Sequence, residues 1–197
     1  LSVSAINLLL GIIIGAAEGY YGGTFDLIFE RVKDIIYEVP TQVTMVLFQL
    51  YLAKKLGPIV ALFFAFIFYG WIGVSSTVRA QFYRFKGQEY VLAARTLGAS
   101  DRRLIFRHIL PNCVPNLIVL FTLDIPGAIM WESSMSFLGV GDPNAASWGL
   151  MVSQGKQFAY MCPWLILAPG LAILITVMAF NFLGDGLRDA FDPKMKR

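Results

Sequence analysis

The sequence has few charged residues and few of the residues that usually catalyse reactions. Only 15% of its 197 residues are charged, and it contains one histidine and two cysteines. His108 has no acid, base or metal-binding partner at motif spacing, and Cys113 and Cys162 lack the spacing of metal ligands. A Gly-x4-Gly-Lys-Ser/Thr phosphate-binding loop is also absent from the sequence. We therefore expect this chain to be no enzyme, to hold no metal site and to leave any ATP hydrolysis to other proteins. Both cysteines are interpreted as small core residues.

Apolar residues, in contrast, are abundant. They make up 57% of the chain, and the mean hydropathy is +0.64. Several apolar runs approach the ~20 residues that a helix needs to cross ~30 Å of hydrocarbon. The sequence predicts an all-α integral membrane protein in which residues 1–197 form a single domain with five transmembrane helices, at residues 3–21, 39–53, 59–78, 116–138 and 163–183. Because residue 1 lies directly in an apolar run without a Met, we expect the chain to be truncated or processed. The distribution of Lys and Arg described below predicts that residue 1 enters from outside, so we expect an N-terminal helix to be missing. The net charge of +3 forms no basic patch of the kind that binds nucleic acid.

The first span and the segment after it carry distinct patterns. Gly11, Gly15 and Gly19 repeat every four residues, which predicts a stripe against which another helix packs closely. Glu18 near the end of this span is expected to reach the membrane interface. Residues 22–38 are amphipathic and predict a helix that lies along the membrane surface.

A polar stretch at residues 87–112 interrupts the apolar sequence and predicts two short helices joined by a turn. In the first helix, small and apolar residues recur at i, i+3, i+4 and i+7, namely Tyr90, Ala93, Ala94 and Leu97. Gly98 is placed to end this helix in a left-handed conformation, and Ser100 with Asp101 is placed to cap the next one. Pro111 is expected to end the second helix.

This helix-turn-helix predicts a docking surface for another protein. Ala93 and Ala94 allow close approach of a partner backbone. Four arginines surround them, at Arg95, Arg102, Arg103 and Arg107, as a partner with an acidic groove would require.

Polar residues within the predicted spans indicate a translocation path. The fourth span contains Asp124, Pro126 and Glu132, the fifth contains Pro169, and the second contains two glutamines. Broken helices with ionisable groups are tolerated in a membrane only beside protein or a water-filled cavity. We therefore expect the path to be lined by Asp124, Glu132, Gln42 and Gln49. The alternative is that Pro126 and Pro169 simply kink their helices for packing.

Positive charges are distributed unevenly about the predicted spans. Of the 16 Lys and Arg residues, only Lys54, Lys55 and Lys156 fall on the side opposite the 87–112 stretch. The C-terminal tail is predicted to lie on the same side as the 87–112 stretch, and it contributes Arg188, Lys194, Lys196 and Arg197. By the positive-inside rule, we expect the 87–112 stretch and the C-terminus to be cytoplasmic.

Four motifs resemble one protein family. Ala93, Ala94, Gly98, Leu110 and Pro111 have the spacing of the cytoplasmic loop of bacterial ABC-importer permeases, although Leu92 and His108 replace its usual Glu and Ile. The run Ser-Phe-Leu-Gly at 136–139, followed by Ser-Trp-Gly at 147–149, is similar to the peptide/nickel branch of that family. The Gly-Tyr-Tyr-Gly-Gly turn at 19–23 and the stretch Asn-Phe-Leu-Gly-Asp-Gly-Leu-Arg-Asp-Ala-Phe-Asp-Pro at 181–193 resemble it as well.

The resemblance implies a C-type permease subunit of a di- or oligopeptide importer in the bacterial plasma membrane. Its implied partners are a second, homologous permease, an extracytoplasmic substrate-binding protein and two ABC ATPases, which would carry the ATP and Mg; no cofactor is implied for this chain. The implied ATPase-coupling residues are Ala93, Ala94, Arg95, Gly98, Ala99, Ser100, Asp101, Arg102, Arg103 and Pro111. Two alternatives remain open, namely a permease for nickel or another small solute and an ion-coupled secondary transporter or channel.

Overall fold

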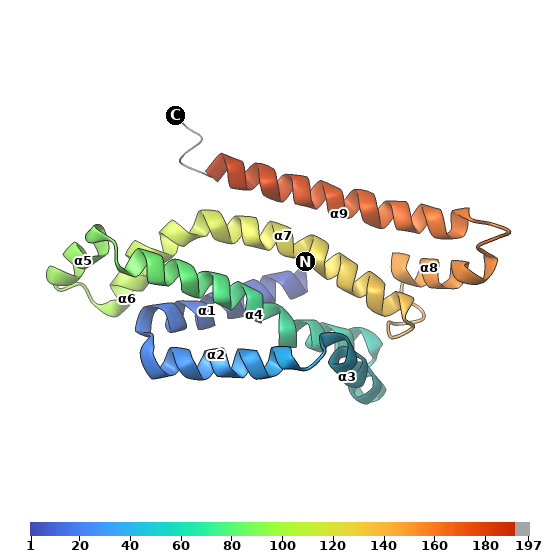
Figure 1. Cartoon of the computed structure of the whole chain (residues 1–197), viewed down its shortest axis with the longest axis horizontal. Helices are drawn as coiled ribbons and strands as arrows, with labels where there is room; N and C mark the ends of the chain where they lie inside the picture. Colours follow the sequence, from blue (N-terminus) through green and yellow to red (C-terminus); the bar gives the residue numbers. More distant parts are fainter. Residues whose placement is uncertain (192–197) are drawn as a thin grey trace.

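The computed structural model describes residues 1–191, and every regular element in this range is helical (Figure 1). The basic tail residues Lys194, Lys196 and Arg197 and the last two motif positions, Asp192 and Pro193, lie outside the described residues. The elements are α1 (Ser2–Tyr21), α2 (Gly23–Glu38), α3 (Thr41–Leu56), α4 (Pro58–Lys86), α5 (Glu89–Thr96), α6 (Asp101–Arg103), the π-helix η1 (Leu104–Ile109), α7 (Leu110–Phe137), α8 (Trp148–Gly155), the 3-10 turn η2 (Lys156–Phe158) and α9 (Trp164–Phe191).

Within residues 1–191, four helices are long and apolar enough to cross a membrane: α1, α4, the continuous helix from Asp101 to Phe137, and α9. A fifth span forms only if α2 and α3 are taken together, with an 82° bend between them. The predicted all-α membrane fold is confirmed. The prediction of 39–53 as a span by itself is wrong, because α3 has only 16 residues and a helix needs about 20 to cross the hydrocarbon.

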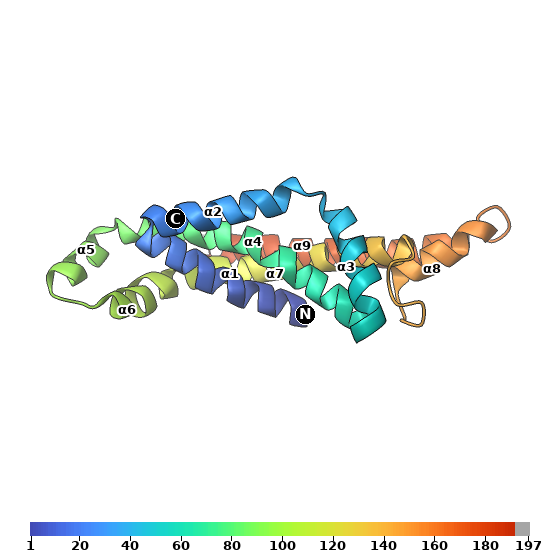
Figure 2. The same ribbon diagram turned by 90° about the horizontal axis from the view of Figure 1, so that it is seen from below.

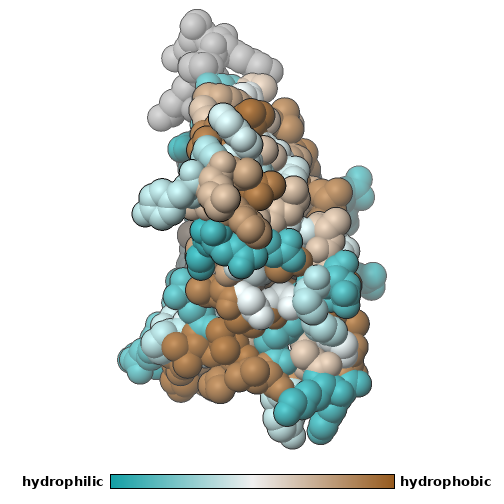
Figure 3. Space-filling view, turned by 90° about the vertical axis from the view of Figure 1, so that its right-hand side faces the viewer, coloured by the Kyte–Doolittle hydropathy of each residue, from teal (hydrophilic) through white to brown (hydrophobic). Residues whose placement is uncertain are grey.

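The long helices lie side by side along the long axis of the molecule. In both views α5 and α6 lie at one end and α8 lies at the opposite end (Figures 1 and 2). The end that carries α8 exposes hydrophobic and polar residues together (Figure 3). Tyr160, Met161 and Trp164 of the turn into α9 are among its exposed residues. The 87–112 stretch, which contains α5 and α6, and helix α8 therefore lie at opposite ends of the bundle.

The helices α1 and α4 are packed through the predicted glycine stripe. A Cβ on Gly11 would lie 2.5 Å from Val74 Cγ1, and a Cβ on Gly19 would lie 2.7 Å from the Arg79 carbonyl oxygen. A Cβ on Gly15 would lie 2.9 Å from Val78 Cβ. These separations are too short for any side chain, so the prediction of close helix approach at these glycines is confirmed.

The prediction that residues 22–38 lie along the membrane surface is wrong. Helix α2 runs beside α1 and α4, parallel to the bundle axis (Figures 1 and 2). Its polar residues Asp26 and Lys33 are buried, whereas its apolar residues Leu27, Ile28 and Ile35 are exposed. The reason is that the charged side of α2 finds partners of opposite charge on α1 and α4, which leaves the apolar side to face outward.

Proline does not end the helices where we expected it to. The chain is helical from Asp101 through η1 to Phe137, and Pro111 is the second residue of α7. The π-helical segment Leu104–Ile109 has wider turns than an α-helix and accommodates the missing N–H at Pro111 without a break. Pro126 and Pro169 likewise lie buried inside unbroken helices. The expectation of broken fourth and fifth spans is therefore wrong, and the alternative of proline in packed helices fits the structure.

In one core cluster, residues of the 87–112 stretch pack against residues of α1, α4 and α7. It contains Tyr20, Phe82, Val91, Leu104 and Ile109, each at most 3% exposed. Cys113 also lies in this cluster, as predicted, but Cys162 is exposed in the turn before α9. A second cluster joins α3, α4 and α7 around Met45, Ala65 and Met135.

Candidate functional site: coupling unit and interhelical cavity

The coupling unit, residues 87–112, turns at Gly98. This glycine has a φ of +82°, so the predicted left-handed stop is confirmed. The Gly98 N–H donates to the Arg95 carbonyl at 3.0 Å, and the Ala99 N–H donates to the Ala94 carbonyl at 3.1 Å. Together these two bonds form a Schellman motif, which satisfies the last carbonyls of α5. The turn angle between α5 and α6 thus depends on a conformation that favours glycine.

The second helix begins as predicted, but its cap differs. Ser100 occupies the N-cap position with an extended backbone, and its side chain caps no N–H. Asp101 instead accepts a hydrogen bond from the Tyr20 hydroxyl of α1. The carboxylate that we expected to cap α6 therefore ties the coupling unit to the first span.

Tyr20 is the anchor of the coupling unit, and sequence reasoning missed it. Its side chain is 3% exposed, and its hydroxyl also accepts a hydrogen bond from Arg95 Nη2 at 3.1 Å. Lys86 Nζ donates to the Tyr20 carbonyl at the end of α4. The bond to Tyr20 raises the pKa of the Arg95 guanidinium, so Arg95 stays charged. The only sequence signal was the tyrosine in the Gly-Tyr-Tyr-Gly-Gly turn.

The structure brings the predicted coupling residues together at one end of the bundle. Exposed members are Ala93, Arg95, Gly98, Ser100, Asp101, Arg102, Arg103 and Pro111, whereas Ala94 and Ala99 are half-buried against the core. Large apolar side chains project beside the arginines, with Leu97 88% exposed and Phe106 62% exposed. This surface combines positive charge with apolar area, a composition suited to a protein partner.

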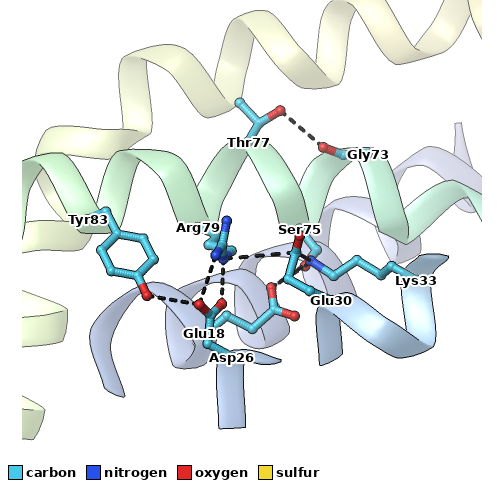
Figure 4. Close-up of polar contacts among 9 residues, drawn as sticks. All are labelled: Glu18, Asp26, Glu30, Lys33, Gly73, Ser75, Thr77, Arg79 and Tyr83. Carbon is cyan, nitrogen blue, oxygen red and sulfur yellow. Dashed lines mark hydrogen bonds and ion pairs between the residues drawn. The ribbon is translucent and has the colours of Figure 1, made fainter. Parts of the chain in front are cut away.

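A buried ionic network joins α1, α2 and α4 (Figure 4). Lys33 Nζ lies 2.8 Å from Glu18 Oε2 and 2.6 Å from Glu30 Oε1. Ser75 donates to the same Glu18 oxygen at 2.9 Å. The expectation that Glu18 reaches the interface is wrong, because its side chain is fully buried.

The network continues toward the coupling unit. Arg79 pairs with Asp26 through Nε and, at 2.8 Å, through Nη2, and Tyr83 donates to the same carboxylate at 2.9 Å. The spacing of Asp26, Glu30 and Lys33 at i, i+4 and i+7 could have revealed this charged face of α2. A polar helix face inside a membrane domain requires partners of this kind.

A cavity of about 290 Å³ lies where α2 bends into α3. Its walls come from α1, α2, α3, α4 and α7, namely Val3, Asn7, Tyr37, Thr41, Met45, Phe66, Tyr69, Gly70, Gly73, Asp124, Gly127, Ala128 and Trp131. Asp124 is half-buried in this wall. Of the four residues predicted for the path, it is the one that lines this cavity.

The other predicted path residues lie elsewhere. Glu132 lines an adjacent cavity of about 400 Å³ that shares the walls Val3, Phe66 and Ala128, and it accepts a hydrogen bond from Ser136 at 2.7 Å. Gln42 lies on the outer side of α3. Gln49 is buried and donates to the Pro58 carbonyl at 3.0 Å. The structure thus places Asp124 and Glu132 in two adjacent cavities, and neither glutamine lines either cavity.

No metal centre is formed by the described part of the chain. Within residues 1–191, no group of three or more His, Cys, Asp or Glu side chains is placed to hold a metal ion. The cavities beside Asp124 and Glu132 are lined by polar, aromatic and apolar side chains.

Comparison with known proteins identifies the family. Residues 7–197 match the sequence profile of the "Binding-protein-dependent transport system inner membrane component" family. The oligopeptide transport system permease protein OppC of Bacillus subtilis is 42% identical over 100% of this chain and 64% of its own length. The dipeptide transport system permease protein DppC of the same species is 40% identical over 98% of this chain and 60% of its length. This chain therefore spans less than two thirds of the length of these relatives.

A solved structure shares the fold. The inward-facing MetNI methionine ABC transporter matches with a TM-score of 0.63 and 17% sequence identity, covering 98% of this chain and 93% of the solved chain. The chain is thus a member of the family of binding-protein-dependent transport system inner membrane components.

Proposed function

We propose that this chain is the C-type transmembrane subunit of an ATP-driven peptide importer. The observation that carries the proposal is the coupling unit, a helix-turn-helix bonded to Tyr20 of α1, with an exposed basic and apolar surface at one end of the bundle. Family membership and the similarity to permeases named for oligopeptide and dipeptide transport support the assignment.

In this proposal the chain works within an assembly in the bacterial plasma membrane. A second, homologous permease completes the translocation path, and an extracytoplasmic binding protein delivers peptide. Two ABC ATPases bind the ATP and Mg, and the chain itself holds no cofactor and hydrolyses nothing. The coupling unit and the C-terminus face the cytoplasm, and residue 1 enters from the outside, as the distribution of Lys and Arg supports.

The topology has a direct test. Lys156 follows α8, at the end of the bundle opposite the coupling unit. An impermeant amine reagent added to right-side-out vesicles should label Lys156, whereas a cysteine reagent should label Arg102→Cys only from the inside. Labelling of Arg102→Cys from the outside would reverse the proposed orientation.

The mechanism we propose is alternating access driven through the coupling unit. Val91, Leu104 and Ile109 are buried in the same cluster as side chains from α1, α4 and α7. Because this core is closely packed, a displacement of the coupling unit by the ATPases moves these three helices with it. The continuous helix from Asp101 to Phe137 extends this connection from the coupling unit to the Asp124 cavity.

The test of coupling uses two glycines of the same stretch. Gly98 has a φ of +82° with no atoms near a would-be Cβ, so Gly98→Val perturbs the backbone alone, at a cost of about 1–3 kcal/mol. Gly87 has equally open surroundings but a φ of −87°, which any residue adopts, so Gly87→Val is the matched control. In reconstituted importer, Gly98→Val should insert and pair with the second permease normally but lose ATPase association or substrate-stimulated ATP hydrolysis.

The comparison of the two variants decides the test, because both add the same branched side chain within the coupling unit. Loss of ATPase coupling in Gly98→Val alone, with Gly87→Val behaving like the unchanged chain, supports the coupling role of the turn. Equal loss in both variants would trace the defect to side-chain bulk and not to the turn. Full transport and ATPase stimulation in the Gly98→Val importer would mean that this stretch does not couple the permease to the ATPases.

A further inference from the structure

The cavity beside Asp124 exists because the chain bends between two half-spans. Val39 is extended and Pro40 lacks an N–H, so the helix cannot continue, and α2 and α3 diverge by 82°. Tyr37 from the end of α2 and Thr41 from the start of α3 both line the cavity. Bent or discontinuous helices that surround a cavity are the features by which transporters build solute sites.

Two hydrogen-bond acceptors in this cavity have no partner. The Asp124 carboxylate has no side-chain hydrogen bond or ion pair with any residue between 1 and 191. Asn7 is 3% exposed, and its Oδ1 is buried without a donor. The side chain of Asn7 fits here because Gly70 has no Cβ, which would lie 2.6 Å from Asn7 Cγ. A buried acceptor without a donor is unfavourable, so Asn7 Oδ1 indicates a ligand that donates hydrogen bonds, and the half-buried Asp124 carboxylate lines the same cavity.

The walls of the cavity favour a cation. Tyr37, Tyr69 and Trp131 supply aromatic rings, which attract ammonium groups. None of the side chains lining the cavity, all within the described residues, is Lys or Arg. The nearby Lys33 is already paired with Glu18 and Glu30. The Asp124 carboxylate is thus the one formal charge among the lining side chains.

We propose that this cavity binds a primary ammonium group of the transported solute, with Asp124 as its counter-ion and Asn7 as a hydrogen-bond acceptor. This inference rests on the proposed function, because it assigns to the imported peptide the group that the path recognises. A volume of about 290 Å³ is near the lower limit of ligand pockets, so the cavity takes one residue of a peptide and not its whole length.

The test measures local charge and occupancy without requiring transport. Gly127 lines the cavity and has no atom within 4 Å of a would-be Cβ, so Gly127→Cys places a thiol there without a clash. The background carries Cys162→Ser, and Cys113 stays because it is buried. In the purified complex, the rates of modification by ethylammonium and ethylsulfonate methanethiosulfonates are compared with and without Asp124→Asn.

We expect the ammonium reagent to be favoured, and Asp124→Asn to lower the ratio of the two rates about tenfold, as loss of a charge a few ångströms away predicts. Asp185→Asn, which removes an exposed carboxylate from α9, should leave the ratio unchanged. A ratio that is the same with Asp124 and with Asp124→Asn would overturn the proposal.

Protection by peptides then identifies the source of the ammonium group. Tri-alanine should slow modification of Gly127→Cys, and N-acetyl-tri-alanine should not. If N-acetyl-Lys-Ala-Ala also protects, the cavity accepts any primary ammonium; if it does not, the cavity is specific for the peptide N-terminus. Equal protection by all three peptides, or by none, overturns the proposal. Full ATPase coupling in the Gly98→Val importer would refute the coupling role without changing this readout, so failure of one proposal is distinguishable from failure of the other.

Discussion

The buried ion pair between Lys33 and Glu18 offers a quantitative prediction. Lys33 is 3% exposed, and its Nζ lies 2.8 Å from a carboxylate that is fully buried. In Lys33→Met the Glu18 carboxylate keeps only the hydrogen bond from Ser75. Removing one partner of a buried pair leaves an uncompensated charge, so we expect the free energy of unfolding to fall by about 3–5 kcal/mol.

The double variant separates the value of the pair from the cost of an unpaired charge. Glu18→Met combined with Lys33→Met removes the fully buried carboxylate and its partner, and it leaves Glu30, which is 35% exposed and lies 3.9 Å from Arg79 Nε. The double variant should recover most of the loss, because apolar side chains of similar size replace buried ion pairs at little cost. The assay is equilibrium unfolding in mixed micelles with increasing denaturing detergent, followed by far-UV circular dichroism. The two single variants and the double variant complete a thermodynamic cycle.

A surface pair on the same helix serves as the control. Arg31 and Asp34 lie 3.5 Å apart with side chains 80% and 59% exposed. Arg31→Met should therefore change stability by at most about 1 kcal/mol. If Lys33→Met costs no more than Arg31→Met, or if the double variant is as unstable as the sum of the singles, the pairing of Lys33 with Glu18 does not hold α2 against α1.

Three further predictions concern packing, anchoring and the cysteines. Gly15→Leu should disrupt the α1–α4 contact and lower the unfolding temperature strongly, whereas Gly170→Leu, where a Cβ meets no atom within 4 Å, should be tolerated. Tyr20→Phe removes the hydrogen bonds to Asp101 and Arg95, so amide exchange in α5 and α6 should accelerate while the spans keep their protection. Cys162 should react with maleimide in the folded protein and Cys113 only after unfolding, and detection of a disulfide between them would contradict the fold.

Local patterns in the sequence predicted the elements that depend on local physics. The Gly98 turn was predictable because its left-handed backbone favours glycine, and the stripe of Gly11, Gly15 and Gly19 because four-residue spacing repeats on one helix face. The approximate positions of α1, α4 and α9 followed from the length of their apolar runs.

The arrangement of α2 and the anchor at Tyr20 could not be predicted in the same way. An amphipathic pattern identifies two faces of a helix but not which face turns inward, and that choice depends on the charges of α1 and α4. The contact from Tyr20 to Asp101 joins residues 81 positions apart. Pro111 misled the prediction because a π-helical turn precedes it and the chain stays helical through it, and no residue pattern in 104–109 indicated such a turn.

The orientation of α2 also bears on how the protein is made. Lys33 pairs with Glu18, which lies only 15 residues earlier in the chain, so this ion pair can form as soon as α2 leaves the ribosome. Asp26 pairs with Arg79, which is synthesised 53 residues later. Asp26 is thus synthesised well before its Arg79 partner, and we expect α2 to reach its final packing only after α4 has been made. We expect biogenesis of this segment to be a cooperative step that waits for a later helix, so that a ribosome stalled before Arg79 leaves α2 accessible to the aqueous phase.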